Sequence, residues 1–334
     1  MKIYIDPDTG REYSIDPTKR GAVTEPLITG IGNRVDLQDK YEGCLLGLAC
    51  GDAVGTTVEF KPRGTFEPVT DMVGGGPFDL KAGQWTDDTS MALCLAHSLL
   101  EQKGFDAKDQ MDRYLRWYQD GYMSSKGYCF DIGLTISGAL KNYALHQNPY
   151  AGSEHPRTAG NGSIMRLAPV PLYYLSSLEQ TIHFAAESSR TTHAAEEAVE
   201  SAKLFAVLIR MALLGHDKKQ ILFENEFYSN TTTVNDLAQG DYVDKEEKHI
   251  KGNGYVINSL EAALWCFAHT DSFEQAVLKA VNLGDDADTT AAIVGQLAGA
   301  YYGVSAIPST WLKKLFMAEQ IKELAINLYV NRHV

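Results

Sequence analysis

The sequence lacks any hydrophobic run suited to crossing a bilayer. Its longest uncharged stretches include residues 43–51 and 291–307, which are too short or too rich in glycine to span one. The first residues, MKIYIDP, lead into no apolar segment, so they do not indicate a secretory signal peptide. These absences predict a cytoplasmic protein without a membrane partner.

Basic residues are scarce as well. Lys and Arg number 30 against 43 Asp and Glu, the formal net charge is −13, and no basic run exceeds two residues. Such a surface has little attraction for a chain of phosphates. We therefore expect no nucleic-acid partner.

The cysteines form no disulfide or metal framework. There are only five, an odd number, and they are scattered and mostly lie in apolar stretches. This distribution is typical of reduced thiols in a core rather than of disulfides or a CxxC zinc site. The five are Cys44, Cys50, Cys94, Cys129 and Cys266.

The sequence also lacks strand patterns. No segment shows sustained alternation of apolar and polar residues with Val, Ile and Thr enrichment between turn signals. Loop segments instead lead repeatedly into helical apolar patterns, so we predict an all-α fold built as a single compact multi-helix domain. The expected helices begin with a buried one from Asp36 and continue at 89–102, 106–120, 131–145, 178–188, 193–214, 258–269 and 273–303.

Glycines recur every fourth residue in the first expected helix. Gly43, Gly47, Gly51 and Gly55 fall on one stripe of that helix. A stripe without side chains predicts that another backbone approaches closely there.

Two parts of the chain differ in composition from the helical body. Residues 1–35 contain breakers such as Asp-Pro and Thr-Gly at short intervals, which predicts an extended arm with a short hairpin around residues 8–10. Residues 224–256 are a long polar interruption, which we interpret as an insertion or helix flank because apolar helices lie on both sides. The expected organisation is an N-terminal arm, 1–35, and one domain, 36–334.

Two acidic segments stand at loop-to-helix junctions: TDDT at 86–89 and DDADT at 285–289. Helix capping explains one or two such residues, since Asp and Thr accept the free amide hydrogens of a first turn. Three carboxylates within four positions repel each other, and a hard divalent cation relieves that repulsion. Without nearby His or Cys the pattern favours Mg²⁺, Mn²⁺ or Ca²⁺ over zinc. If the segments meet in space, they could hold two ions about 3.5–4 Å apart.

Glycine-rich turns supply candidate anion sites. Residues 74–76, 160–163 and 252–255 can each present backbone amides without a Cβ in the way. None matches GxxxxGK[ST], and no GxGxxG follows a strand, so a P-loop or Rossmann site is excluded. Asp52 lies between the last two glycines of the stripe and Glu59 follows it, and both could simply be solvated or satisfy nearby backbone groups.

Seven segments, in order, resemble the successive motifs of the ADP-ribosylglycohydrolases. The group that they most resemble is the bacterial one typified by dinitrogenase reductase-activating glycohydrolase. The resemblance runs from about residue 38 to residue 330 and leaves out the arm and residues 224–250. The segments are GCLLGLACGDAVGTTVEF (43–60), GGGPFDLKAGQWTDDTSMAL (74–93), CFDIG (129–133), GNGSIMRLAPVPL (160–172), SSRTTHAAEEAV (188–199), GNGYVINSLEAALWCF (252–267) and NLGDDADTTAAIVGQLAGAYYG (282–303).

The resemblance implies an all-α hydrolase with two Mg²⁺ or Mn²⁺ ions that cleaves the N- or O-glycosidic bond between ADP-ribose and a protein side chain. The CFDIG segment favours arginine as that side chain, so the expected partner is an ADP-ribosylated protein. By the resemblance, the metal ligands are Thr86, Asp87, Asp88, Asp286, Asp288 and Thr289, with Asp285 left outside as a cap.

The resemblance also implies catalytic and substrate-binding residues. Asp131 and Glu59 are the candidate catalytic carboxylates, one as acid and one as base, with their order left open. His193 matches a histidine close to the substrate, although it could equally cap the helix expected from 193. The substrate-binding candidates are Lys126, Gly127 and Tyr128 at the ribose, Gly160, Asn161, Gly162 and Ser163 at the pyrophosphate, Gly252 and Tyr255 at the adenosine end, and His193.

Two other functions use similar residues. A two-metal phosphatase or phosphodiesterase needs the same oxygen ligands, but it would also bring a nucleophile or a His, Lys or Arg clamp close to them. A non-catalytic scaffold of crystallin type shares the fold, and the presence of every acidic position argues against it.

The arm suggests a protein partner. Some members of the family resemble immunity proteins encoded beside ADP-ribosyltransferase toxins. An extended segment suits the concave nucleotide cleft of such a transferase, so we hypothesise that residues 1–35 bind it. The alternative is that the arm packs on its own domain or forms an oligomer contact.

Overall fold

The computed structural model describes residues 2–5, 12–15 and 34–333, with side chains from Leu37 onward. Most of the expected arm therefore lies outside the described residues. Within it, β1 (Lys2–Ile5) and β2 (Glu12–Ile15) pair antiparallel, with Ile3 opposite Ser14. The turn expected around residues 8–10 also lies outside the described residues.

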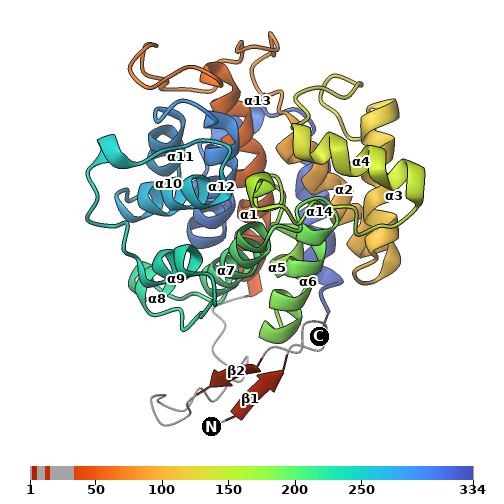
Figure 1. The fold of residues 1–334 in the computed structure, drawn as a ribbon. Coiled ribbons are helices and arrows are strands. Elements are labelled where there is room, and N and C mark those ends of the chain that lie inside the picture. The colour runs from red at the N-terminus through yellow and green to blue at the C-terminus, as the bar shows by residue number, and fades with distance from the viewer. Residues whose placement is uncertain (1, 6–11, 16–33, 334) are drawn as a thin grey trace.

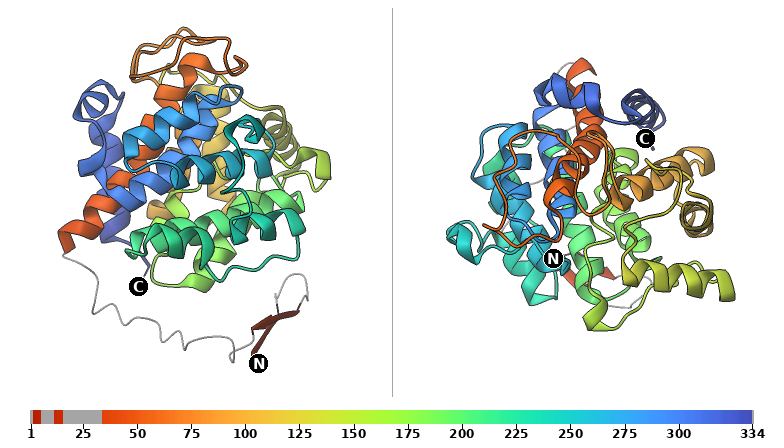
Figure 2. Two further views of the ribbon diagram at one scale, coloured as in Figure 1. Left: turned by 90° about the vertical axis from the view of Figure 1, so that its left-hand side faces the viewer. Right: turned by 90° about the horizontal axis from the view of Figure 1, so that it is seen from above.

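The glycine stripe positions the two central helices. Helix α1 (Arg34–Gly55) packs against α12 (Ala287–Tyr302), and the two lie side by side at the centre of the molecule (Figures 1 and 2). A Cβ added at Gly51 would lie 2.1 Å from the carbonyl oxygen of Ala291, and one at Gly47 would lie 2.4 Å from that of Gly295. The predicted close approach of a second backbone is confirmed.

Other helices pack around this pair in two groups. On one side lie α7 (Glu196–Leu213), α10 (Val256–Ala268) and α11 (Phe273–Val281), which all contact α12. On the other side, α3 and α4 lie outside α2 (Figure 1), where Met91, Tyr114 and other residues form a second, smaller core. The remaining α-helices are α2 (Asp87–Gln102), α3 (Ala107–Asp120), α4 (Leu134–His146), α5 (Pro169–Tyr173), α6 (Leu178–Arg190), α8 (Lys218–Phe223), α9 (Thr232–Gln239), α13 (Ser309–Lys314) and α14 (Ala318–Val330). The part of the chain that the structure describes also holds the short 3-10 helices η2 (Thr56–Val58), η3 (Pro156–Thr158), η4 (Glu247–His249) and η5 (Val304–Ala306).

The all-α prediction is confirmed over residues 34–333, whereas several helix bounds were wrong. The run expected at 273–303 is two helices, because Gly284 and Asp285 adopt left-handed backbone angles, φ 73° and 57°, that no helix continues through. The helix expected from residue 131 begins at Leu134, after the left-handed Asp131. Helices α5, α8, α9, α13 and α14 were not predicted from the sequence, and α9 lies inside the stretch interpreted as a polar interruption.

The cysteine prediction is confirmed, since all five thiols are free and four of them are buried. Among the described residues, no helix is both long and apolar enough to reach across a bilayer.

Candidate active site

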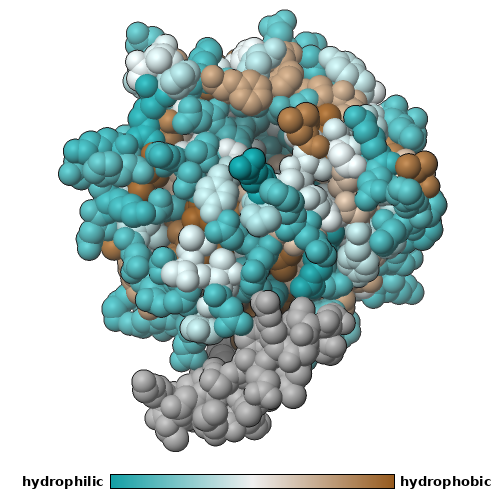
Figure 3. Space-filling model, viewed as in Figure 1, coloured by the Kyte–Doolittle hydropathy of each residue, from teal (hydrophilic) through white to brown (hydrophobic). Residues whose placement is uncertain are grey.

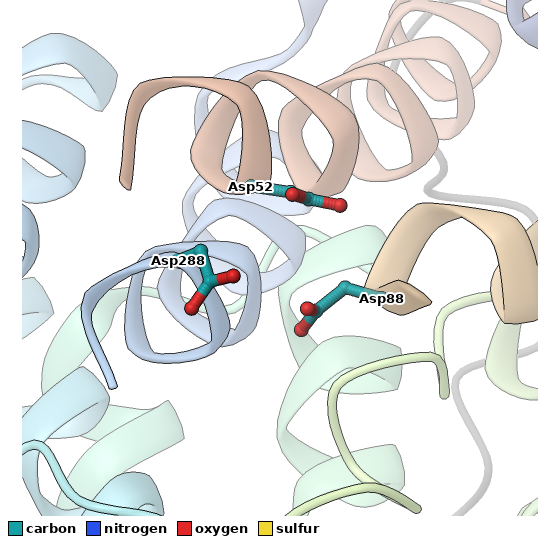
Figure 4. A group of neighbouring side chains, drawn as sticks. All are labelled: Asp52, Asp88 and Asp288. Carbon is teal, nitrogen blue, oxygen red and sulfur yellow. The ribbon is translucent and has the colours of Figure 1, made fainter. Parts of the chain in front are cut away.

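The two acidic segments meet at one end of the central helix pair. Asp88 lies in the first turn of α2 and Asp288 in the first turn of α12, and both carboxylates turn toward the same space beside Asp52 of α1 (Figure 4). The Thr86 hydroxyl lies 3.2 Å from Asp88 Oδ2 and 3.3 Å from Asp288 Oδ2. On the other side, the Thr289 hydroxyl lies 3.4 Å from Asp88 Oδ2. Segments 200 residues apart thus form one oxygen-rich cluster.

Asp52 organises this cluster and was not among the predicted site residues. Its carboxylate accepts hydrogen bonds from the backbone N–H groups of Thr86 and Thr89, at 2.9–3.1 Å, and from both of their hydroxyls. The first turn of α2 is therefore capped from α1, while Thr86 itself makes no side-chain cap. This agrees with the interpretation that Asp52 satisfies backbone groups. Asp52 directly follows Gly51, which touches α12. That position in the sequence could have predicted that Asp52 lies at the site.

Glu59 and Asp131 form a second carboxylate group with Asp288. One oxygen from each lies within 4.8 Å of the others. Burial together with neighbouring carboxylates raises the pKa of Glu59 to about 10, and the same causes raise that of Asp131 to about 8. Asp131 has a left-handed backbone, φ 59°, which directs its side chain from the loop before α4. The structure thus brings both predicted catalytic carboxylates next to the predicted metal ligands.

The cluster has the chemistry of a site for hard cations. Burial and mutual repulsion raise the pKa of Asp87, Asp88 and Asp288 well above the usual range. Glu59 Oε2 and Asp88 Oδ1 are buried and have no hydrogen-bond partner. Buried carboxylate oxygens without donors are costly unless a cation binds them, so these groups could hold metal ions.

The two later glycine-rich turns converge on the second acidic segment. Asn161 donates from Nδ2 to Asp286 Oδ2 at 2.7 Å, and its backbone N–H donates to Gly254 O at 3.1 Å. Asp286 in turn donates its N–H to Gly252 O at 2.8 Å. The Asn161 side chain is thus occupied by Asp286, while Ser163 Oγ is buried without a partner.

A hollow of about 540 Å³ lies beside these turns. Gly160, Gly254 and Tyr255 line it, and the Tyr255 hydroxyl donates to Glu197 Oε2 at 2.6 Å. Glu197 was missed from the sequence, because it lies 58 residues from Tyr255 in the first turn of α7. Its place in the TTHAAEEA motif was the available signal.

A model of the ADP-ribosylglycohydrolase family matches residues 33–333. The chain belongs to this family. It is 44% identical over 291 residues to the ADP-ribosylarginine hydrolase Tri1 of Serratia proteamaculans, covering 87% of this chain and 79% of that protein. It is 32% identical to the ADP-ribosyl-[dinitrogen reductase] glycohydrolase of Rhodospirillum rubrum, covering 84% and 92% of the two chains. A solved structure described as an ADP-ribosylglycohydrolase-related protein complex aligns with TM-score 0.79 at 45% identity, covering 90% of this chain and all of that one.

The chain is therefore a hydrolase of the ADP-ribosylglycohydrolase family. The phosphoesterase and scaffold alternatives considered from the sequence are set aside, since both the family match and the relatives point to the glycohydrolase.

In this glycohydrolase, His193 is held by a buried chain of hydrogen bonds. Arg166 Nη2 donates to the Thr192 hydroxyl at 2.7 Å, and that hydroxyl lies 2.9 Å from His193 Nδ1. The tautomer of the neutral ring sets which of these two groups donates to the other. Burial lowers the pKa of His193 to about 3. Helix α7 begins at Glu196, so His193 does not cap it as the alternative required.

His193 packs against the glycine turn at 160–163. A Cβ added at Gly162 would lie 2.7 Å from His193 Cε1, and one at Gly160 would lie 3.2 Å from Nε2. The ring therefore defines the shape of that turn.

The predicted ribose loop lies beside Thr86. Ser125 Oγ donates to Trp85 O at 2.5 Å, and Lys126 Nζ donates to Phe78 O at 2.8 Å. Lys126 thus anchors the loop, while Gly127 and Tyr128 are exposed along it.

Asp285 stands one residue before the N-cap of α12, which is Asp286. It is exposed and pairs through its backbone with the segment after Glu59. It therefore does not take the capping position that the resemblance left to it.

Proposed function

We propose that this ADP-ribosylglycohydrolase releases ADP-ribose from modified arginine side chains of proteins, with two Mg²⁺ or Mn²⁺ ions in the acidic cluster. The observation that carries the proposal is that Asp288 belongs to two carboxylate groups at once, one with Asp52 and Asp88 and one with Glu59 and Asp131. The names of the relatives from Serratia proteamaculans and Pseudomonas putida, both ADP-ribosylarginine hydrolases, support arginine as the linkage.

We assign the metal ligands to the residues of the two acidic segments, whose helices α2 and α12 both begin at the shared space. Asp52 is excluded, because four donors already occupy its carboxylate. When bound, the ions would grip the 2′ and 3′ hydroxyls of the ribose at the scissile bond and stabilise charge on that sugar. The proposed ligands are Thr86, Asp87, Asp88, Asp286, Asp288 and Thr289.

Asp131 and Glu59 are the proposed acid and base. The leaving guanidine needs a proton, and the attacking water must lose one. Burial and the neighbouring carboxylates raise the pKa of both groups, which favours a protonated form that could supply the proton to the leaving group. Their shared contact with Asp288 keeps both beside the proposed ribose position.

The rest of the substrate is assigned to the turns around the hollow. Tyr255, fixed by Glu197, would stack on the adenosine end, and Gly252 would support the backbone beside it. The neutral His193 supports the turn for the pyrophosphate without adding charge. The proposed pyrophosphate residues are Gly160, Asn161, Gly162 and Ser163, and those at the ribose are Lys126, Gly127 and Tyr128.

We also propose that residues 36–334 are the hydrolase domain and that residues 1–35 are an arm that binds an ADP-ribosyltransferase toxin, as in an immunity protein. The free cysteines suit the reducing cytoplasm, where such protection would act. Deleting residues 1–35 should abolish inhibition of the partner transferase while turnover stays intact. A truncated protein that still blocks the transferase would contradict the role of the arm.

The linkage and the metals are tested together. Arginine-, serine- and glutamate-linked ADP-ribosyl peptides would be incubated with the protein in Mg²⁺, Mn²⁺ or EDTA, and free ADP-ribose would be measured. We expect release from the arginine-linked peptide with either metal and none in EDTA. Undiminished release in EDTA would contradict the metal sites, and release from the serine-linked peptide alone would contradict the arginine linkage.

A further inference from the structure

Phe60 directly follows Glu59 and adopts an unfavourable conformation. Its backbone is left-handed, φ 61°, and its side chain is 65% exposed. A bulky residue in this region is a true outlier, and an aromatic ring in water gains no burial. Strain of this kind persists where the surrounding structure imposes it, and it is concentrated at functional sites.

The second acidic segment imposes this conformation. The Phe60 N–H donates to Asp285 O at 2.7 Å, and the Asp285 N–H donates to Lys61 O at 2.9 Å. Asp285 is itself left-handed, φ 57°. These two backbone hydrogen bonds tie the segment after Glu59 to the second acidic segment. They therefore also hold the Phe60 ring outward.

Three rings, Phe60, Phe78 and Phe130, form an aromatic row that links the two proposed catalytic residues. The centroids of Phe60 and Phe78 are 6.5 Å apart, and those of Phe78 and Phe130 are 5.3 Å apart. Phe130 directly precedes Asp131, so the row runs from one carboxylate to the other. Figure 2 shows the loop after α1 at the top of the molecule, and in Figure 3 hydrophobic residues gather near the top of the face, between that loop and α4.

The ammonium group of Lys126 already makes a cation–π contact at one end of the aromatic row. Lys126 Nζ lies 5.6 Å from the centroid of Phe130. Phe60, at the other end, contacts no cation in this way among the described residues and remains open to solvent. The row is also separate from the hollow beside Gly160 and Tyr255, which none of its three rings lines.

We propose that the exposed face of Phe60 is a platform for the guanidinium group of the ADP-ribosylated arginine, and that Phe60 determines specificity for this leaving group. The inference rests on the proposed function. A guanidinium is planar, weakly hydrated and attracted to aromatic faces. Ester- or serine-linked ADP-ribose presents no such cation. Phe60 does not line the hollow proposed for the nucleotide, and it directly follows the proposed catalytic Glu59, so we place the departing protein side chain on the Phe60 side.

The test compares wild-type enzyme with Phe60→Leu and Phe60→Tyr. We expect Phe60→Leu to lower kcat/KM for an arginine-linked ADP-ribosyl peptide about ten-fold, as loss of a cation–π contact predicts. The inhibition constant of free ADP-ribose, which has no guanidinium, should stay unchanged. Phe60→Tyr keeps an aromatic face and should retain most of the wild-type kcat/KM.

Two results would overturn the inference. An unchanged kcat/KM in Phe60→Leu would mean that the ring contacts no part of the leaving group. An equal loss in kcat/KM and in ADP-ribose inhibition would mean that the ring only supports the site. A failure of the proposed function itself is distinguishable, because wild-type enzyme would then release no ADP-ribose from the arginine-linked peptide.

A glycine variant separates strain from contact. Phe60→Gly removes the ring and relieves the left-handed backbone, so Tm should not fall while kcat/KM does. Lys103→Gly is the matched control, since Lys103 is exposed and left-handed, φ 57°, at the far end of α2. We expect it to raise Tm by about 1–2 °C and to leave kcat/KM unchanged. A marked fall in Tm for Phe60→Gly would show a structural ring and overturn the inference.

Discussion

Two regions of the α1–α12 pair differ in how their residues pack: the glycine-lined middle, called here the body, and the end that carries the buried carboxylates. In the body, Gly43, Gly47 and Gly51 let two uncharged backbones touch, and nothing polar from a side chain intervenes. At the end, Asp52 of α1 and Asp288 of α12 are buried among other carboxylates (Figure 4). Close packing in the body brings the two helices together. As a result, the carboxylates at the end of the pair share one small space.

The difference shows where stability is gained and where it is given up. Close packing of backbone on backbone stabilises the fold. Buried carboxylates that repel each other destabilise it until protons or cations neutralise them. A substitution in the body should therefore lower stability, whereas one that removes a carboxylate at the end should raise the stability of the metal-free protein and lower activity.

The largest effect is expected from Asp288→Asn, which removes the charge shared by both carboxylate groups. Turnover of an arginine-linked peptide should fall at least about 10³-fold, because metal-ion catalysis supplies several kcal/mol. The metal-free protein should have a higher Tm than wild type, since one source of repulsion is gone. Equal turnover, or a lower metal-free Tm, would contradict this account of the cluster. Scanning calorimetry in EDTA and an ADP-ribose release assay measure the two quantities.

Gly51→Ala tests the body of the pair. The new Cβ would meet the Ala291 carbonyl oxygen at 2.1 Å, and a backbone atom cannot turn aside. We expect the free energy of unfolding to fall by about 3 kcal/mol or more. Gly138→Ala is the control, because Gly138 lies exposed in α4 with no atom within 4 Å of the added Cβ. It should stabilise the protein by about 0.5–1 kcal/mol in urea unfolding, and similar effects at both positions would refute the packing argument.

Asp131→Asn and Glu59→Gln separate chemistry from binding at the charged end. Each keeps the shape of the side chain and removes its proton exchange, so kcat should fall about 10²-fold or more. Calorimetric titration with ADP-ribose should give an affinity close to that of wild type. A residue whose variant loses affinity in proportion to rate belongs to the binding or metal site instead.

The charged end should also make the stability of the metal-free protein depend on pH. The pKa values of Asp52, Asp131 and Glu59 are raised to about 6, 8 and 10, largely by burial. Above pH 4 the folded state therefore binds more protons than the unfolded state, and stability falls as pH rises through this range. Each extra proton contributes a slope of about 1.4 kcal/mol per pH unit.

Urea unfolding between pH 5 and 9 measures that slope. Saturating Mg²⁺ should flatten it, because a bound cation takes the place of the protons. Asp288→Asn should also have a shallower slope than wild type in EDTA. Identical slopes with and without the metal would show that the carboxylates do not bind it.

Local patterns in the sequence were enough for the helical class and for the two acidic segments, whereas the individual candidate residues came from the family resemblance. The four-residue glycine spacing predicted the α1–α12 contact, because periodicity depends only on helix geometry. The acidic segments predicted oxygen-rich helix starts, because Asp and Thr accept the free amide hydrogens of a first turn. Helix α14 could also have been found, since Ile321, Leu324, Ala325 and Leu328 follow the spacing of an apolar helix face.

The tertiary structure alone decided how these residues combine. Asp52 caps a helix that starts 35 residues later, and Glu197 fixes a tyrosine 58 residues away. No local rule carries such pairings, because they depend on how whole helices pack. The same packing forces Phe60 into a left-handed backbone by pairing it with Asp285, more than 200 residues along the chain. The sequence determined which groups were available, and the close approach of two glycine-lined helices decided that they share one site.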